Sequence, residues 1–170
     1  MKTEINNYDE RSAGGVVYKI EKGKVKWLVI KTGVSKGFGR QGGGGKAPKT
    51  AYKFPKGHLK AGEFLKQAAL REVEEEGRVK AKIVTKIGSN NYLIWDKLQK
   101  KKIIKKVTFF LMEYKEESRL KYFDAEVVLE RAWLPYQEAA EKLEYHSEKV
   151  LLGKAEKTLQ ALLKGQKAVK

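Results

Sequence analysis

The sequence contains no cysteine and only three prolines in its 170 residues. Without cysteine, disulfide bonds and thiolate chemistry are excluded, which is consistent with a reducing compartment. Long apolar runs are also missing, since the run from Val107 to Met112 is far too short to span a bilayer. Residues 1–15 contain no apolar segment of the kind that a signal peptide requires. These absences predict a cytoplasmic protein with no membrane partner.

Negative charge is scarce relative to positive charge. The chain has 37 lysines and arginines against 21 aspartates and glutamates, which gives a formal net charge of +16. An excess of this size indicates a polyanionic partner such as a nucleotide, another polyphosphate or RNA, and solubility alone is the plain alternative. With 41% hydrophobic and 34% charged residues, the composition is globular, and the length suits one compact domain whose oligomeric state the sequence leaves open.

Apolar periodicity and turn residues predict a succession of strands and helices. The expected strands span residues 12–20, 25–30, 82–87, 105–114 and 130–135, and the expected helices span residues 64–76, 137–143 and 148–163. The first two strands form a hairpin around a turn that contains Gly23, and Gly77 is expected to end the first helix. This order of elements indicates an α/β (α+β) domain with a mixed sheet.

A glycine-rich loop at 33–50 separates the hairpin from the first helix. It has no periodicity, and loops of this length in small domains are usually functional or disordered. Its segment GRQGGGGK superficially suggests a phosphate cradle, but Lys46 is followed by Ala47 and Pro48 rather than by the serine or threonine and the helix of a P-loop. We therefore expect this loop to shape the entrance of a binding site and not to form a P-loop.

Acidic residues crowd into the first helix. Residues three and four apart share one helix face, so Glu72, Glu75 and Glu76 are expected to form a carboxylate ledge. The adjoining arc is apolar and is expected to pack against the sheet: Ala69, Leu70 and Val73. Like charges repel more strongly when they are partly desolvated, and a hard divalent cation would remove this conflict. The alternative is a solvated face with helix pairs such as Arg71–Glu75.

The spacing Gly57-x5-Glu63-x7-Arg71-Glu72-Val73-x-Glu75-Glu76 resembles the Nudix box, Gly-x5-Glu-x7-Arg-Glu-U-x-Glu-Glu-x-Gly-U, in which U is aliphatic. The chain departs from this pattern at one place, because the glycine stands at Gly77 and Arg78 occupies the position where the pattern expects it. The resemblance implies a Nudix-type α/β/α sandwich with a central mixed sheet, formed by residues 1–170 as a single Nudix domain.

The resemblance also implies roles for these residues in hydrolysis. The three carboxylates expected to bind Mg²⁺ or Mn²⁺ and to supply the base are Glu72, Glu75 and Glu76. The carbonyl of Gly57 would be a further metal ligand. Arg71 would hold a glutamate in place, and Glu63 would partner Arg71 or a metal-bound water. A later acidic ligand is expected from Glu126 or Glu130.

The residues around the box indicate a substrate class. The segments FPKGH (residues 54–58), KKVTFFLM (105–112) and WLPYQEAAEKLEYHSEKVLL (133–152) resemble the subgroup that hydrolyses dinucleoside polyphosphates such as diadenosine tetraphosphate. The implied reaction is metal-dependent hydrolysis of a diphosphate linkage in a nucleoside polyphosphate. The alternatives are nucleoside triphosphate clean-up, removal of pyrophosphate from RNA 5′ ends, hydrolysis of diphosphoinositol polyphosphates, and a catalytically silent nucleotide- or RNA-binding module.

Several basic and aromatic residues are candidates for substrate binding. Lys53 and Lys56 are expected to meet phosphates, as are Arg40 and Lys46 in the loop, and solvated lysines are the alternative. Tyr145 is expected to stack on a base, with a packed aromatic as its alternative. The lysine-rich segment of residues 96–106 is expected to form the arm or tip of a hairpin. Two aromatics that precede it are also considered for binding a nucleobase: Tyr92 and Trp95.

Overall fold

The computed structural model describes residues 9–33, 50–121 and 128–168. Its strands are β1 (Glu10–Glu21), β2 (Lys24–Gly33), β3 (Thr50–Lys53), β4 (Lys56–His58), β5 (Val79–Asp96), β6 (Lys101–Glu117) and β7 (Val128–Leu134). Its helices are α1 (Leu65–Gly77), α2 (Tyr136–Lys142) and α3 (His146–Ala168). All the expected elements are present, and the short strands β3 and β4 were not expected. The candidates Arg40, Lys46 and Glu126 lie outside the described residues.

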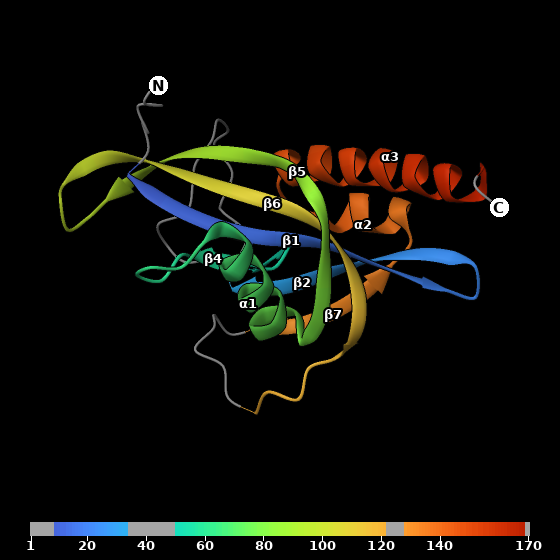
Figure 1. The fold of residues 1–170 in the computed structure, drawn as a ribbon. Helices are drawn as coiled ribbons and strands as arrows, with labels where there is room; N and C mark the ends of the chain where they lie inside the picture. Colours follow the sequence, from blue (N-terminus) through green and yellow to red (C-terminus); the bar gives the residue numbers. More distant parts are fainter. Residues whose placement is uncertain (1–8, 34–49, 122–127, 169–170) are drawn as a thin grey trace, which may run out of the picture.

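The seven strands form one mixed sheet in the order β3-β2-β1-β6-β5 (Figure 1). The two remaining strands branch from this path, because β4 pairs with β1 and β7 pairs with β2. Only β1 and β6 run parallel among the described strand pairs, and the other pairs are antiparallel. The mixed sheet expected from the order of elements is therefore confirmed.

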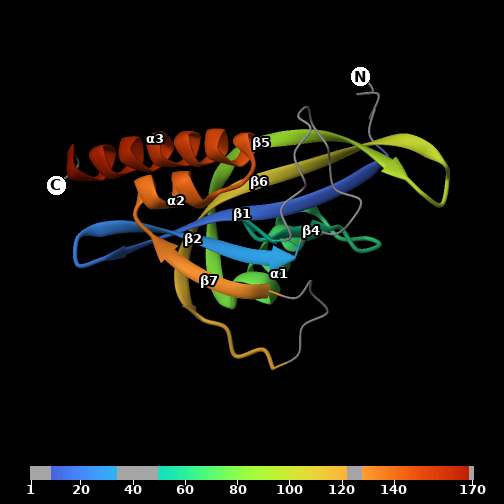
Figure 2. The ribbon, with the colours of Figure 1, turned by 180° about the vertical axis from the view of Figure 1, so that it is seen from behind.

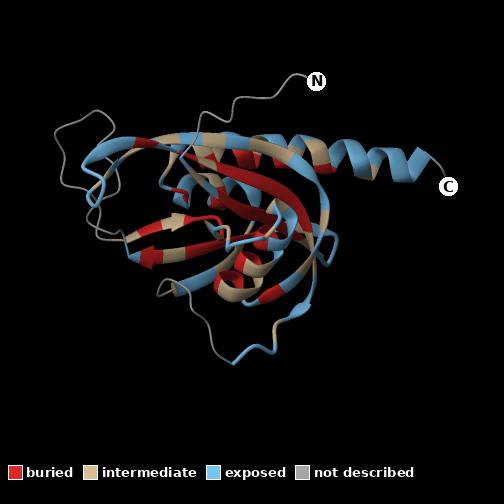
Figure 3. Ribbon diagram, turned by 60° about the vertical axis from the view of Figure 1, so that its left-hand side comes forward, coloured by how far each residue is buried: buried red, intermediate tan, exposed pale blue. Residues whose placement is uncertain are grey.

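Helices cover both faces of the sheet. On β1, Ala13 and Val17 pack in a core with buried residues of α1, whereas Val16 and Tyr18 pack in a second core with α2 and α3. Successive strand side chains point to opposite faces, so the apolar run of β1 supplies both cores. Figures 1 and 2 show α1 on one side of the sheet and α2 and α3 on the other, and Figure 3 shows the buried middle of the sheet. The expected α/β/α sandwich is confirmed.

The strands β5 and β6 form a long hairpin whose lysine-rich end projects from the sheet (Figure 1). Near this end, the side chain of Trp95 is 56% exposed. Tyr92 packs instead against the core beneath α3, with its hydroxyl 3.3 Å from Oγ of Ser147. Tyr92 is therefore a core residue. Within the described ranges, no helix is both long and apolar enough to cross a membrane.

Helix α1 buries an arc that overlaps the predicted one, because Ala69 and Val73 are buried as expected and Leu70 is not. The buried residues of this helix are Ala68, Ala69, Glu72, Val73, Glu76 and Gly77. At about 100° per residue these positions form one arc with Glu76 near its centre. Leu70 falls just outside this arc and is 37% exposed, so its expected packing against the sheet is wrong. The buried arc therefore extends from Ala69 and Val73 onto the carboxylate ledge, where Glu72 and Glu76 are buried.

The helix also ends one residue later than expected. Gly77 is still helical, and Arg78 adopts the left-handed conformation with φ of 61°. The N–H of Arg78 donates to the carbonyl oxygen of Glu74 at 3.1 Å, which closes the last turn. An arginine therefore performs the left-handed turn at the position where the Nudix pattern expects glycine.

Candidate active site

The carboxylates of α1 lie directly against the segment that leads into β4. Oε2 of Glu76 accepts a hydrogen bond of 2.9 Å from the backbone N–H of Lys56. A Cβ atom at Gly57 would overlap the carboxylate of Glu72, so only glycine allows the strand to approach so closely. Glu72 and Glu76 are 7% and 3% exposed. The structure thus brings Glu72 and Glu76 together with the backbone of Lys56 and Gly57 in a buried setting.

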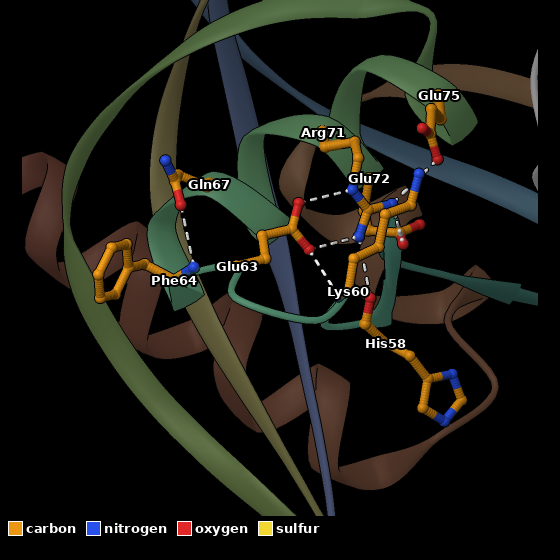
Figure 4. A network of polar contacts seen from close by, with 8 residues as sticks. All are labelled: His58, Lys60, Glu63, Phe64, Gln67, Arg71, Glu72 and Glu75. Carbon is orange, nitrogen blue, oxygen red and sulfur yellow. Dashed lines mark hydrogen bonds and ion pairs between the residues drawn. The ribbon is translucent and has the colours of Figure 1, made fainter.

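Arg71 organises the acidic residues around itself (Figure 4). Its Nε and Nη2 donate to the two carboxylate oxygens of Glu63 at 2.7 and 2.9 Å. Its Nη1 donates to Oε1 of Glu72 at 2.6 Å and to Oε2 of Glu75 at 3.1 Å. A further bond of 2.9 Å joins Nη2 to the carbonyl oxygen of His58. The contacts expected between Arg71 and glutamates are therefore present, and they connect three carboxylates to the end of β4.

Glu63 lies just before α1, and hydrogen bonds from Lys60 and Arg71 hold its carboxylate. The N–H of Lys60 donates to its Oε2 at 2.9 Å, in addition to the two bonds from Arg71. These hydrogen bonds, above all those from Arg71, lower the pKa of Glu63. Glu63 is therefore an ionised partner that keeps the guanidinium in one orientation.

Burial raises the pKa values of Glu72 and Glu76, whereas hydrogen bonds lower the pKa of Glu63. Desolvation raises the pKa of Glu76 to about 7, against the opposing charges of Lys53 and Lys56. Desolvation also raises the pKa of Glu72, although Arg71 partly offsets it. Both carboxylates are therefore harder to ionise than a free glutamate.

The oxygen atoms gathered here fit a hard divalent cation. Mg²⁺ and Mn²⁺ prefer oxygen ligands, which the carboxylates of Glu72, Glu75 and Glu76 and the carbonyl of Gly57 would supply. The desolvated carboxylates and the missing Cβ at Gly57 both agree with this fit. In the described part of the chain, no three acidic or histidine side chains are already arranged as metal ligands. Arg71 occupies one oxygen each of Glu72 and Glu75, so a cation would share these carboxylates with it.

The expected phosphate-binding lysines are largely buried rather than solvated. Lys53 is 8% exposed, and the side chain of Lys56 is 15% exposed. Nζ of Lys56 lies 3.9 Å from Oε1 of Glu148, at the start of α3. The alternative of simple solvated loop lysines is therefore wrong for both, and each places positive charge near the α1 carboxylates.

The other expected site residues lie elsewhere. Tyr145 is half-buried just before α3, where its carbonyl accepts the N–H of Glu148 at 3.0 Å. Glu130 accepts a hydrogen bond of 2.7 Å from the hydroxyl of Tyr52. Its neighbour Arg131 donates from Nε to the carbonyl oxygen of Glu76 at 2.8 Å. Since adjacent strand residues point to opposite faces, Glu130 faces away from the end of α1.

Sequence reasoning missed Glu148 and Arg131. Glu148 is completely buried in α3, and Arg131 satisfies a carbonyl in the last turn of α1. A signal for Glu148 was available, because it stands three and four residues before Leu151 and Leu152 on the apolar face of a helix. Nothing in the local sequence distinguishes Arg131, because its contact depends on the packing of β7 beside α1.

Comparison with known proteins agrees with the fold and the box. Residues 12–152 match the family model of the NUDIX domain. A curated relative, the putative mutator protein MutT4 of Mycobacterium tuberculosis (strain CDC 1551 / Oshkosh), is 32% identical over 111 residues, which are 65% of this chain and 43% of that protein. The match thus spans less than half the length of this relative.

Solved structures show the same architecture. An Ap4A hydrolase of C. elegans in a binary complex superposes with a TM-score of 0.61 at 22% identity, over 92% of this chain and 98% of that one. A NUDIX hydrolase from Nitrosomonas europaea superposes with a TM-score of 0.64 at 17% identity, over 88% and 89% of the two chains. These likenesses show the fold alone. Because the domain model covers most of the chain, the protein belongs to the Nudix family, the family of the Nudix hydrolases.

Proposed function

We propose that this protein hydrolyses a diphosphate linkage in a nucleoside polyphosphate with the help of Mg²⁺ or Mn²⁺. The observation that carries the proposal is the burial of Glu72 against the backbone of Gly57 and of Glu76 against that of Lys56. Two adjacent desolvated carboxylates cost free energy unless a cation or a proton neutralises them. Dependence on a divalent metal is general among Nudix hydrolases, which agrees with this reading.

Different residues of the site would bind the cation, accept a proton and position the carboxylates. Glu72, Glu75, Glu76 and the carbonyl of Gly57 would hold the cation, which when bound polarises a diphosphate and acidifies water. One of these glutamates would accept the proton of that water as the general base. Arg71 fixes the positions of the carboxylates of Glu63, Glu72 and Glu75 through its ion pairs with them.

Two lysines beside the carboxylates and one aromatic residue that precedes α3 would bind the substrate. Lys53 and Lys56 are charged groups next to Glu76, so they are suited to attract phosphate oxygens. Tyr145 lies just before α3, three residues from the buried Glu148, which itself contacts Lys56. We assign to Tyr145 the stacking of a nucleobase, since aromatic rings stack readily on bases.

The favoured substrate is a dinucleoside polyphosphate such as diadenosine tetraphosphate. The segment FPKGH at the site and the similarity to an Ap4A hydrolase over nearly the whole length of both chains support this choice. Nucleoside triphosphate clean-up is the second candidate, because the curated relative is named a mutator protein. The net charge of +16 fits RNA 5′ ends and diphosphoinositol polyphosphates slightly better than it fits nucleoside triphosphate clean-up.

A substrate panel tests the proposal. Purified protein with Mg²⁺ or Mn²⁺ would be incubated with diadenosine tetraphosphate, nucleoside triphosphates, 5′-triphosphorylated RNA and a diphosphoinositol polyphosphate, and the products would be identified by mass. We expect metal-dependent cleavage that is greatest for diadenosine tetraphosphate and is lost with a chelator. Salt-sensitive RNA binding without turnover of any substrate would show instead a catalytically silent module.

A further inference from the structure

Glu148 is a buried carboxylate that the proposed chemistry does not use. It lies in the first turn of α3 with 0% exposure, on the same helix face as Leu151 and Leu152. An apolar residue would fill this core position without the desolvation cost of a carboxylate. Packing alone therefore gives no reason for a glutamate here.

The two polar contacts described for the carboxylate of Glu148 are both with residues 54–56. Its Oε2 accepts the backbone N–H of Phe54 at 3.0 Å, and its Oε1 lies 3.9 Å from Nζ of Lys56. No described residue forms a hydrogen bond with Oε1. From the α3 side of the sheet, the carboxylate thus holds residues 54–56, where the chain passes from β3 into β4.

The opposite side of this segment faces the α1 carboxylates. The N–H of Lys56 donates to Oε2 of Glu76 at 2.9 Å, and Gly57 lies against the carboxylate of Glu72. Residues 54–57 are therefore held from one side by α3 and from the other by α1. A shift of this short segment would move both the carbonyl of Gly57 and the ammonium of Lys56 relative to Glu72 and Glu76.

We propose that Glu148 is a positioning residue: it fixes residues 54–57 so that the Gly57 carbonyl and Lys56 face the metal-binding carboxylates of α1. This inference rests on the proposed function. It also explains the energetic cost of Glu148, because a charged acceptor holds both a backbone N–H and an ammonium, which no apolar side chain does. Outer partners of this kind orient the groups that bind metal and substrate.

The first test is Glu148→Gln, which keeps the size of the side chain and an oxygen that accepts the Phe54 N–H but removes the charge facing Lys56. Mn²⁺ affinity is measured by electron paramagnetic resonance, and the amide resonances of Lys56 and Gly57 are followed by NMR. We expect Mn²⁺ affinity and kcat to fall about 10- to 100-fold, with shifted amide resonances at both positions. Glu148→Met, which has a similar volume and no charge, is expected to give the same losses.

Two controls separate positioning from stability. Leu159→Ala removes a buried side chain from the same helix, more than two turns from Glu148, and is expected to lower Tm without changing Mn²⁺ affinity. Glu138→Gln removes an exposed carboxylate from α2 and is expected to change neither. If Leu159→Ala weakened Mn²⁺ binding as much as Glu148→Gln at an equal loss of Tm, the role of Glu148 would be structural only.

The outcomes for Glu148 and for the proposed function are distinguishable. Unchanged Mn²⁺ affinity and unchanged amide resonances in both Glu148 variants, with normal turnover, would overturn the positioning role and leave the hydrolase intact. A wild-type protein that cleaves no substrate of the panel would overturn the hydrolase. In that case weakened Mn²⁺ binding and shifted amides in the Glu148 variants would still support positioning, and their absence would refute it.

Discussion

Arg71 of α1 and Glu63, which precedes this helix, form a bidentate ion pair. Nε donates to Oε1 at 2.7 Å, and Nη2 donates to Oε2 at 2.9 Å. The same guanidinium uses Nη1 for Glu72 and Glu75, so its planar set of donors serves three carboxylates at once. A single lysine ammonium does not reproduce this geometry, because it is a point charge without a rigid fork.

Arg71→Lys should therefore be a damaging substitution. We expect the free energy of unfolding to fall by about 1.5–3 kcal/mol, the range for hydrogen bonds to charged groups, because the carboxylates of Glu63, Glu72 and Glu75 lose fixed donors. Urea unfolding measures this change, and Arg119→Lys on the exposed surface is the matched control. Equal stability of the two variants would show that a simple positive charge is sufficient at position 71.

Glu76→Gln should abolish most of the hydrolytic activity without unfolding the protein. The amide keeps an oxygen for the N–H of Lys56 but neither accepts a proton nor binds a divalent cation well. We expect kcat to fall at least about 10²-fold, as for loss of a general base. The exposed carboxylate Glu138 provides the control variant Glu138→Gln. Full turnover in Glu76→Gln would remove Glu76 from the mechanism.

Gly57→Ala tests the close approach of strand and helix. The added Cβ would overlap the carboxylate of Glu72, so the helix and strand must separate. We expect stability to fall by about 1–3 kcal/mol, as in overpacked cores, and Mn²⁺ affinity to weaken in parallel. Gly165→Ala is the control, because nothing lies near its added Cβ, and it should be neutral or stabilising by up to about 1 kcal/mol in α3. Denaturant unfolding and Mn²⁺ titration measure the two effects.

The pKa of Glu76 predicts how stability depends on pH in the metal-free protein. Its folded pKa of about 7 lies above the ordinary value of 4.5, so the folded state binds the proton more tightly than the unfolded state. This contribution is fully present below pH 4.5 and is lost as pH rises through about 7. Its upper limit is about 3 kcal/mol, which corresponds to the rise of the pKa from 4.5 to about 7. Urea unfolding at pH 5 and pH 7 in a chelator measures the loss.

The variant Glu76→Gln should reduce this loss of stability, because an amide does not titrate. Glu72 and Glu148, whose pKa values are also raised by burial, would account for what remains. Mg²⁺ should have the opposite dependence and bind more tightly as pH rises through the same range, since it competes with the proton. A stability profile that is identical in wild type and Glu76→Gln would contradict the assignment.

Arg78 carries a left-handed backbone that most residues disfavour. Arg78→Gly and Arg78→Ala both remove the side chain, so the difference between them reports the backbone conformation. We expect the glycine variant to be more stable than the alanine variant by about 1 kcal/mol, because glycine adopts positive φ without steric cost. Thermal or urea unfolding measures the difference, and an alanine variant of equal stability would show that the turn relaxes to another conformation.

Several features of the fold follow from local sequence patterns. The first hairpin, helix α1 and the lysine-rich end of the long hairpin all lie where alternation, helical spacing and turn residues predicted them. Local patterns failed where tertiary contacts decide the outcome. Leu70 is apolar but exposed, and Glu76 is charged but buried, because α1 docks with its carboxylate face turned toward the segment leading into β4.

The sequence by itself determined the order of the elements and the spacing of the glutamates, because helical and strand periodicities are properties of neighbouring residues. Only the tertiary structure decided which charges meet. Glu148 contacts Lys56 across 92 positions of sequence, and Arg131 reaches the carbonyl of Glu76 from another strand. Such contacts form only when the layers of the sandwich pack together in the folded chain. The low dielectric between these layers then raises the pKa values of the buried carboxylates Glu72, Glu76 and Glu148.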